Sequence, residues 1–182
     1  MSYSSETARY RHLTRQHCFR EDGQPGCGID LASQGDAVVP WAWQLDLPEA
    51  EFMIYNDNHP IRSPVNLRSD AFGRFVEPNS LDFIYCSHLL EDRPYEEWGT
   101  IMGNWRSALK PNGKLIVLCP ERNLWAEAIK RGQCPNCAHR YEPLLGDLTK
   151  AGEAAGFLTV LERMTNVFDG DYSVLYIGLN PG

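Results

Sequence analysis

Three aspartates stand at or near the ends of short apolar runs, and their placement suggests a shared ligand site. Asp30 lies in GIDLASQGD, Asp46 in AWQLDL and Asp70 at the end of VNLRSD. The carboxyl ends of parallel strands meet at one edge of a sheet, where ligands bind. An acid after the second strand can accept both hydroxyls of a ribose, and an acid after the third can accept from the adenine amine. Together they predict an adenosine-containing ligand, although any one of them alone could simply cap a turn.

The residues after Asp30 form a turn of small side chains, which lets the backbone approach a ligand closely. They are Ala32, Ser33, Gln34 and Gly35. The turn lacks the G-x-G-x-x-G spacing of a dinucleotide site and the Lys and Ser/Thr of a P-loop. By itself it therefore does not identify the ligand.

The elements that must position these residues are strands and helices in alternation. Seven apolar runs of strand length recur along the chain: GIDLAS, AWQLDL, VNLRSD, LDFIYCS, GKLIVLC, FLTVLERM and YSVLYIGL. Several are almost continuously apolar, as strands buried on both faces of a parallel sheet must be. Helical patterns cover residues 94–110 and 144–155. The alternation predicts an α/β fold with a doubly wound sheet.

The first half of the chain leaves little room for helices. Too few residues separate GIDLAS from AWQLDL for the usual crossover helix. We therefore expect reduced helices there, with residues 3–17 supplying a covering helix from a helical extension over residues 1–22. With no linker in 182 residues, residues 1–182 are expected to form a single domain.

Composition narrows the classes of function. The formal net charge of −7 and the lack of a long basic run disfavour tight binding to nucleic acid. No apolar segment suits a signal peptide or a membrane span, so we expect a soluble, cytoplasmic protein that binds no membrane. The six cysteines are not expected to form structural disulfides. Composition does not predict the oligomeric state.

The series GIDLASQG, QLDLP, LRSDA, LDFIYCSHLLED and ALKPNGKLIVLCP resembles the class I S-adenosylmethionine-dependent methyltransferases. The resemblance covers roughly residues 28–156, and its most specific parts are the last two segments. It implies a mostly parallel, seven-stranded, Rossmann-like sheet in which YSVLYIGL is the antiparallel last strand. It also implies S-adenosylmethionine as the cofactor.

The resemblance assigns cofactor contacts residue by residue. Asp30 would orient the glycine turn, Asp46 would bind the ribose hydroxyls, and Asp70 would bind the adenine edge. Ser87 and His88 would lie beside the methionine portion and the methyl group, and His88 could instead be a structural histidine. The complete set of implied cofactor contacts is Asp30, Ala32, Ser33, Gly35, Asp46, Leu47, Asp70, Ala71, Ser87 and His88.

Two positions depart from the family pattern. The turn usually reads D-x-G-x-G, but here Ala32 replaces the first glycine and Gly35 is shifted by one position. The loop after the fourth strand commonly reads S-H-x-L-E-H, but here Asp92 replaces the last histidine. The first departure puts the strength of cofactor binding in question.

Residues 120–143 form a long insertion after the fifth strand, where folds of this kind place their specificity. We expect this segment to cover the acceptor pocket together with Ser87 and His88. Its candidates for acceptor binding are Trp125, Tyr141 and Glu142, and His139 joins His88 as a candidate catalytic residue. Trp41 and Trp43, which flank the second strand, could pack in the core or stack on adenine.

The segment QCPNCAHRYE offers Cys134, Cys137 and His139, a spacing that suits zinc. A structural zinc needs a fourth ligand, which Cys18 or His17 could supply only if distant parts of the chain meet. We therefore expect no metal.

The favoured function is transfer of a methyl group to a small-molecule oxygen or nitrogen acceptor. The alternative is a non-catalytic binding or regulatory module that keeps the fold. A nicotinamide oxidoreductase would need a glycine fingerprint that this chain lacks. RNA cytosine-C5 methylation would use Cys86 and Cys119, which close the fourth and fifth strands, but the acidic charge disfavours it.

Overall fold

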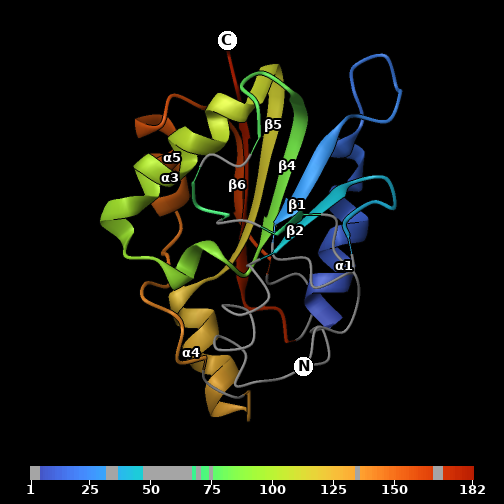
Figure 1. Ribbon diagram of the computed structural model, residues 1–182. Coiled ribbons are helices and arrows are strands. Elements are labelled where there is room, and N and C mark those ends of the chain that lie inside the picture. Colours follow the sequence, from blue (N-terminus) through green and yellow to red (C-terminus); the bar gives the residue numbers. More distant parts are fainter. Residues whose placement is uncertain are drawn as a thin grey trace.

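The seven apolar runs form one mixed sheet (Figure 1). The computed structural model describes residues 5–31, 37–46, 67–68, 71–73, 76–133, 136–165 and 170–182. The strands are β1 Gly28–Leu31, β2 Trp43–Asp46, β3 Leu67–Arg68, β4 Leu81–Ser87, β5 Leu109–Pro120, β6 Leu158–Met164 and β7 Ser173–Leu179. Their order across the sheet is β3-β2-β1-β4-β5-β7-β6. The predicted α/β fold is therefore confirmed.

The sheet combines parallel and antiparallel neighbours. β1 pairs in parallel with β2 and β4, and the pairs β2–β3 and β4–β5 are also parallel. β7 runs antiparallel to both β5 and β6, as the YSVLYIGL segment was expected to do. The parallel strands end at the lower end of the molecule in Figure 1, where α4 (Arg122–Lys130) lies.

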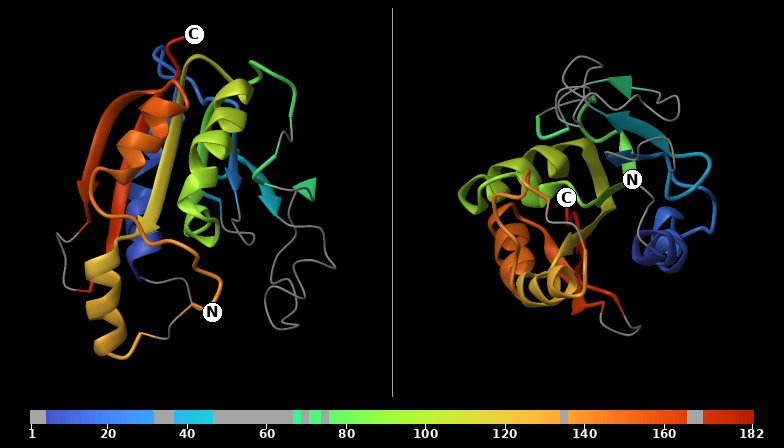
Figure 2. Two further views of the ribbon diagram at one scale, coloured as in Figure 1. Left: turned by 90° about the vertical axis from the view of Figure 1, so that its left-hand side faces the viewer. Right: turned by 90° about the horizontal axis from the view of Figure 1, so that it is seen from below.

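Helices cover both faces of the sheet. α3 (Tyr95–Ala108) and α5 (Asp147–Ala154) lie on one face, and α1 (Ser5–Thr14) lies on the other (Figure 2). Short 3-10 turns follow α1 at Arg15–Cys18 (η1) and β4 at Leu90–Asp92 (η2). None of the described residues between β1 and β2, residues 37–42, is helical.

The structure corrects three details of the predicted helices. The pattern over residues 94–110 ends at Ala108, because Leu109 already pairs with Leu81 of β4. The helix predicted from residue 144 begins only at Asp147, whose carboxylate accepts the N–H of Leu144 in the preceding turn. The sequence interpretation also missed α4, which lies inside the expected insertion.

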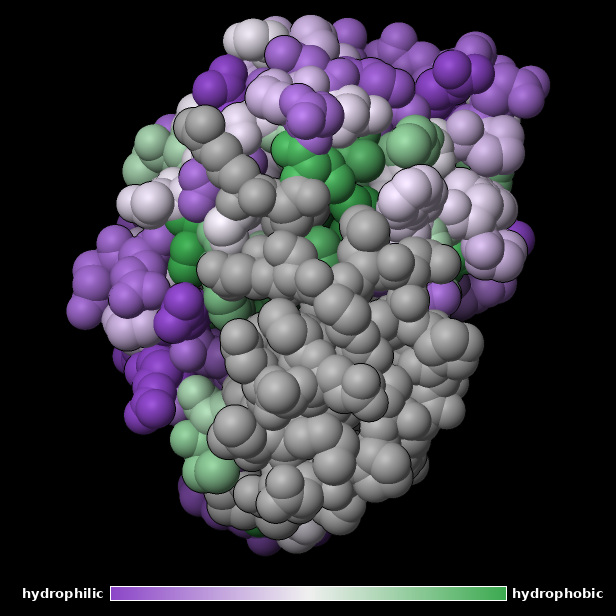
Figure 3. Space-filling view, viewed as in Figure 1, coloured by the Kyte–Doolittle hydropathy of each residue, from purple (hydrophilic) through white to green (hydrophobic). Residues whose placement is uncertain are grey.

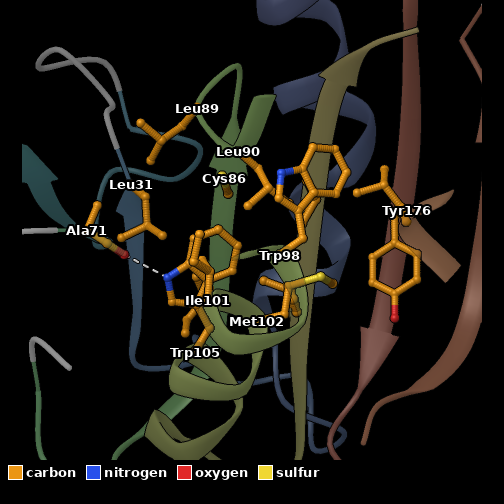
Figure 4. Packing of buried hydrophobic residues seen from close by; sticks show 14 of the residues in the cluster. Leu31, Ala71, Cys86, Leu89, Leu90, Trp98, Ile101, Met102, Trp105 and Tyr176 are labelled. Carbon is orange, nitrogen blue, oxygen red and sulfur yellow. Dashed lines mark hydrogen bonds between the residues drawn. The ribbon is translucent and has the colours of Figure 1, made fainter. Parts of the chain in front are cut away.

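The core between the sheet and α3 is built around two tryptophans (Figure 4). Trp98 and Trp105 are fully buried, and their ring N–H groups donate to the carbonyl oxygens of Arg93 at 3.0 Å and Ala71 at 2.7 Å. Burying these large rings without losing their hydrogen bonds fixes α3 against the sheet. The loop that carries Ala71 is thereby tied to α3.

The opposite face packs against α1. Side chains alternate along β4, so Phe83 and Tyr85 join the cluster with Tyr10 of α1 while their neighbours face α3. A Cβ at Gly28 would lie 2.4 Å from the ring of Phe83, so only glycine fits at the start of β1. Both faces of the central strands are therefore buried, as their apolar sequences predicted.

Glu6 fastens α1 to the end of the sheet. Its buried carboxylate accepts hydrogen bonds from the Thr165 hydroxyl, the backbone N–H groups of Tyr172 and Ser173, and the Ser173 hydroxyl, at 2.6–3.0 Å. The Tyr10 hydroxyl adds a bond to the Thr165 carbonyl at 2.7 Å. These bonds hold the chain around Tyr172 in place beside the carboxyl ends of the strands.

The amino end of the parallel strands is a solvated rim. Hydrophilic residues cover the upper end of the face shown in Figure 3. Arg20, Glu21 and Asp22 are exposed and lie near Asp82, at the start of β4. No helix among the described residues is long and apolar enough to span a bilayer. The polar side chains that are buried near strand ends lie mainly at the opposite, carboxyl end.

Candidate functional site at the carboxyl ends of the strands

Asp30 anchors the chain where it returns to the sheet after β1. Its side chain is fully buried, and Oδ2 accepts a hydrogen bond from the backbone N–H of Val38 at 2.6 Å. The bond joins the end of β1 to the described residues that precede β2. Residues 32–36 lie outside the described residues, so the turn-orienting role of Asp30 and its contact with a cofactor stay predictions.

The other predicted cofactor contacts on this side are only partly described. Five of them lie outside the described residues: Ala32, Ser33, Gly35, Leu47 and Asp70. Asp46 is the last residue of β2, in register with Arg68 of β3, so its backbone lies at the carboxyl edge. Ala71 is buried, and its carbonyl oxygen is taken up by Trp105.

Ser87 and His88 stand where β4 ends. Ser87 is buried, and its hydroxyl has no hydrogen-bond partner within the described part of the chain. His88 adopts a φ of 54°, in the left-handed region that non-glycine residues seldom occupy, and its backbone N–H donates to Leu118 at 2.8 Å. Such a constrained backbone is common at functional sites.

The environment of His88 keeps its imidazole neutral. Burial, together with the charges of His139 and of Arg11 on α1, lowers the pKa of His88 to about 3. Its Nε2 atom is buried and makes no hydrogen bond to any described residue, and the ring lies edge-on to Tyr172 at 5.7 Å. A neutral imidazole has one donor and one acceptor nitrogen, so this ring can donate one hydrogen bond and accept another.

Glu91 of η2 is a completely buried carboxyl group of the site. Its side chain is 0% exposed, and neither carboxylate oxygen has a hydrogen-bond partner among the described residues. Oε1 lies 3.7 Å from His88 Nδ1 and 3.7 Å from His139 Nε2. Burial, and secondarily the charge of Asp92, raises the pKa of Glu91 well above its usual value. The neutral acid, which can both donate and accept, is therefore favoured.

His139 extends this group toward the surface. Its Nδ1 lies 3.1 Å from Oε1 of Glu142, whose side chain is 30% exposed. Trp125 of α4 packs against the rings of His139 and Tyr172 at 5.4 and 4.9 Å. The structure therefore brings together four of the residues that the sequence assigned to the acceptor side: His88, Trp125, His139 and Glu142.

Backbone hydrogen bonds hold the insertion against the end of β4. The N–H groups of Arg140 and Tyr141 donate to the carbonyl oxygen of Glu91 at 2.7 and 3.1 Å. Glu121 caps α4 by accepting the N–H groups of Asn123 and Leu124. The positions of His139 and Trp125 thus follow from a capped helix and a tethered loop.

Tyr141 lies apart from this cluster. Its hydroxyl donates to Asp147 at 2.8 Å, and its ring stacks on Tyr95 at 4.8 Å. The guanidinium of Arg122 covers the ring at 4.9 Å. Tyr141 therefore joins the insertion to α3 and α5, and an acceptor contact by this residue stays a prediction.

The cysteines show no sign of metal or nucleophilic chemistry in the described part of the chain. Cys134 lies outside the described residues, Cys137 is exposed, and no group of three or more His, Cys, Asp or Glu described here is arranged to hold a metal ion. Burial and the charge of Glu91 raise the pKa values of the Cys86 and Cys119 thiols. Both thiols are therefore poorly suited to attack as thiolates.

Solved structures share this architecture. An S-adenosylmethionine-dependent methyltransferase from Mesorhizobium loti aligns with a TM-score of 0.67 over 97% of this chain and 98% of its own, at 13% sequence identity. The 1,6-didemethyltoxoflavin-N1-methyltransferase of Burkholderia thailandensis, solved with 1,6-didemethyltoxoflavin and S-adenosylhomocysteine, aligns with a TM-score of 0.67 over 98% of this chain and 79% of its own, at 16% identity. The chain has the class I methyltransferase fold. Neither a model of a known protein family nor the sequence of a curated protein matches it.

Within the class I methyltransferase fold, sequence reasoning missed three residues of the site. The sequence places Glu91 only in the loop pattern, Tyr172 in a strand and Arg11 in a covering helix. One signal was available for Glu91, because H-L-L-E at residues 88–91 and H-R-Y-E at residues 139–142 repeat the same spacing. Tyr172 and Arg11 reach the site only through tertiary packing, which no local spacing reveals.

Proposed function

We propose that this protein is an S-adenosylmethionine-dependent methyltransferase that acts on an oxygen or nitrogen atom of a small molecule. The observation that carries the proposal is the cluster of His88, Glu91 and His139, with buried and unpartnered polar atoms, at the carboxyl edge of a sheet with the methyltransferase fold. Buried polar groups without partners are costly and are therefore informative about ligands. The small-molecule acceptor of the Burkholderia neighbour supports this acceptor class.

The described residues suit the proposed cofactor. Asp30 holds the turn after β1, and the unpartnered Ser87 hydroxyl lies at the end of β4, on the same edge of the sheet. We assign the ribose hydroxyls to Asp46 and the adenine edge to Asp70. The acidic character of this edge suits a sulfonium cation, because opposite charges attract most strongly away from water.

Bound S-adenosylmethionine would supply an electrophilic methyl group. The side chains of the protein position the acceptor and exclude water. The rings of Trp125 and Tyr172 form an apolar wall beside His88, whose neutral imidazole can hydrogen-bond an acceptor N–H or O–H. His139 packs against Trp125 and faces Glu142, so we assign both residues, with Tyr141 as a further candidate, to acceptor binding.

The assignment of Asp46 gives a direct test. Isothermal titration with S-adenosylhomocysteine should show weaker binding to Asp46→Ala by about 1–3 kcal/mol, the range for unpaired buried partners. Asp22→Ala is a matched control, because Asp22 is exposed at the opposite end of the strands. Equal affinity of both variants and the wild type would remove Asp46 from the site.

A further inference from the structure

Four ionisable side chains form a continuous series within the candidate site. His88 Nδ1 faces Glu91 Oε1 at 3.7 Å, the same oxygen faces His139 Nε2 at 3.7 Å, and His139 Nδ1 faces Glu142 Oε1 at 3.1 Å. In this order the side chains are 23%, 0%, 5% and 30% exposed. The series therefore leads from the buried Nε2 atom of His88, through two buried side chains, to the partly exposed carboxylate of Glu142.

His88 and Glu91, the inner members of the series, can each both give and take a proton. The imidazole of His88 is neutral, so one nitrogen can accept while the other donates. A carboxylic acid such as neutral Glu91 has the same dual capacity, and its Oε1 atom faces both imidazoles. The two gaps of 3.7 Å exceed hydrogen-bond length, as is common in catalytic pairs before the substrate is bound.

We propose that His88, Glu91, His139 and Glu142 form a proton relay, and that the acceptor is a molecule that carries a proton on the atom to be methylated. This inference rests on the proposed methyltransferase function and adds a substrate class to it: amines with an N–H, alcohols or phenols. Tertiary amines and thioethers, which have no proton to lose, are excluded.

The lone pair of the acceptor nitrogen or oxygen forms a bond to the methyl carbon, and the carbon–sulfur bond breaks with its electron pair staying on sulfur. The acceptor proton passes to Nε2 of His88 while the proton on Nδ1 of His88 passes to Glu91. Oε1 of Glu91, which faces both imidazoles, takes up this proton as it gives its own proton to Nε2 of His139. Nδ1 of His139 then gives a proton to Glu142, which releases it to water. His88, Glu91 and His139 each end with the number of protons they had before.

Several charged or ionisable neighbours act on the relay. Burial is the main cause that lowers the pKa of His88 and raises the pKa of Glu91; His139 and Arg11 add to the first shift, and Asp92 and Glu142 add to the second. The thiol of Cys119 lies against the carboxyl group of Glu91 and acts in the opposite direction on its pKa. Burial therefore favours the uncharged forms of His88 and Glu91, which the relay needs.

The test compares methyl transfer with proton release in a single turnover. Protein loaded with S-adenosylmethionine labelled in its methyl group is mixed with a panel of primary and secondary amines, alcohols and phenols. Tertiary amines and thioethers of matched carbon skeleton serve as counterparts. A pH-indicator dye follows proton release, and the labelled product follows transfer. We expect products only from acceptors that carry a proton.

Glu142→Gln tests the outer end of the relay. The side chain is partly exposed, so this variant should fold. In weak buffer we expect proton release to lag behind the wild type by about tenfold or more, and added imidazole buffer should restore it because a small base can replace Glu142. Glu127 is an exposed carboxylate on the nearby α4, so proton release by Glu127→Gln should match that of the wild type.

The outcomes separate the two proposals. Equal transfer to acceptors without a proton, or a Glu142→Gln protein whose proton release matches the wild type at every buffer concentration, would overturn the relay. Methyl transfer itself would still support the proposed function. Failure of the wild type to methylate any member of the panel would contradict the proposed function and, with it, the relay.

Discussion

Replacing Glu91 by glutamine should make the protein more stable at neutral pH, although it alters the candidate site. The side chain is fully buried, its oxygens have no partner in the described part of the chain, and its pKa is raised well above the ordinary value of 4.5. Glutamine keeps the shape of the protonated acid but cannot ionise. The substitution therefore removes a cost that Glu91 imposes on the folded state.

The pH dependence fixes the sign of this effect. The unfolded chain releases the Glu91 proton near pH 4.5, whereas the folded protein keeps it to a higher pH. Between the two pKa values the folded state binds more protons, so the contribution of Glu91 to stability falls as pH rises. The stability difference between Glu91→Gln and the wild type should grow by about 1.4 kcal/mol per pH unit in this window, then level off.

His88 contributes with the opposite sign. Its pKa falls from 6.5 to about 3 on folding, so its stabilising contribution is present above pH 6.5 and is lost as pH falls toward 3. Because His88 is present in both proteins, its contribution should largely cancel in their difference. The wild type alone should show a flatter profile between pH 4.5 and 6.5 than Glu91→Gln.

Urea unfolding, followed by circular dichroism at half-unit steps from pH 4 to 8, measures this difference. Glu96→Gln is the control for the loss of a carboxylate, because Glu96 is exposed on the neighbouring α3. A difference for Glu91→Gln that is also flat, or that favours the wild type as pH rises, would refute the interpretation of Glu91 as a buried neutral acid.

Two further substitutions test the parts that position the site. Glu6→Gln should lower the free energy of unfolding by about 1–3 kcal/mol, because the carboxylate accepts from four donors in and near β7. Urea unfolding at pH 7 measures this free energy. A variant as stable as the wild type would contradict the anchoring role of Glu6. Gly28→Ala should lower stability by about 1–3 kcal/mol because its Cβ would meet Phe83, and an unchanged melting temperature would show that the ring can move aside.

Most of the fold could be predicted from local sequence. Runs such as LDFIYCS are apolar at nearly every position, which only a strand buried on both faces explains, and β4 occupies Leu81–Ser87 as expected. α4 was missed because its sequence, RNLWAEAIK, is polar on most of its surface and buries mainly Trp125 and Ala128. Leu124, Trp125, Ala128 and Ile129 do recur at helical spacing and pack together, so this pattern and the Glu121 cap were signals that the chain offered.

The candidate site could be predicted only in part. His88 and His139 were identified as candidates, but their closeness to each other depends on the backbone bonds that tie residues 140 and 141 to Glu91. The importance of Glu91 lies in its complete burial without hydrogen-bond partners, which is a property of the folded chain. The roles predicted for Asp46 and Asp70 in cofactor binding stay predictions.

A calorimetric titration of the wild-type protein with S-adenosylhomocysteine, beside an identical titration with NAD, tests the central claim most directly. A protein that uses S-adenosylmethionine should bind S-adenosylhomocysteine at one site per chain and should give no heat with NAD, because it lacks the glycine fingerprint of a dinucleotide site. A folded protein that gives no heat with S-adenosylhomocysteine, or that binds NAD instead, would contradict the account.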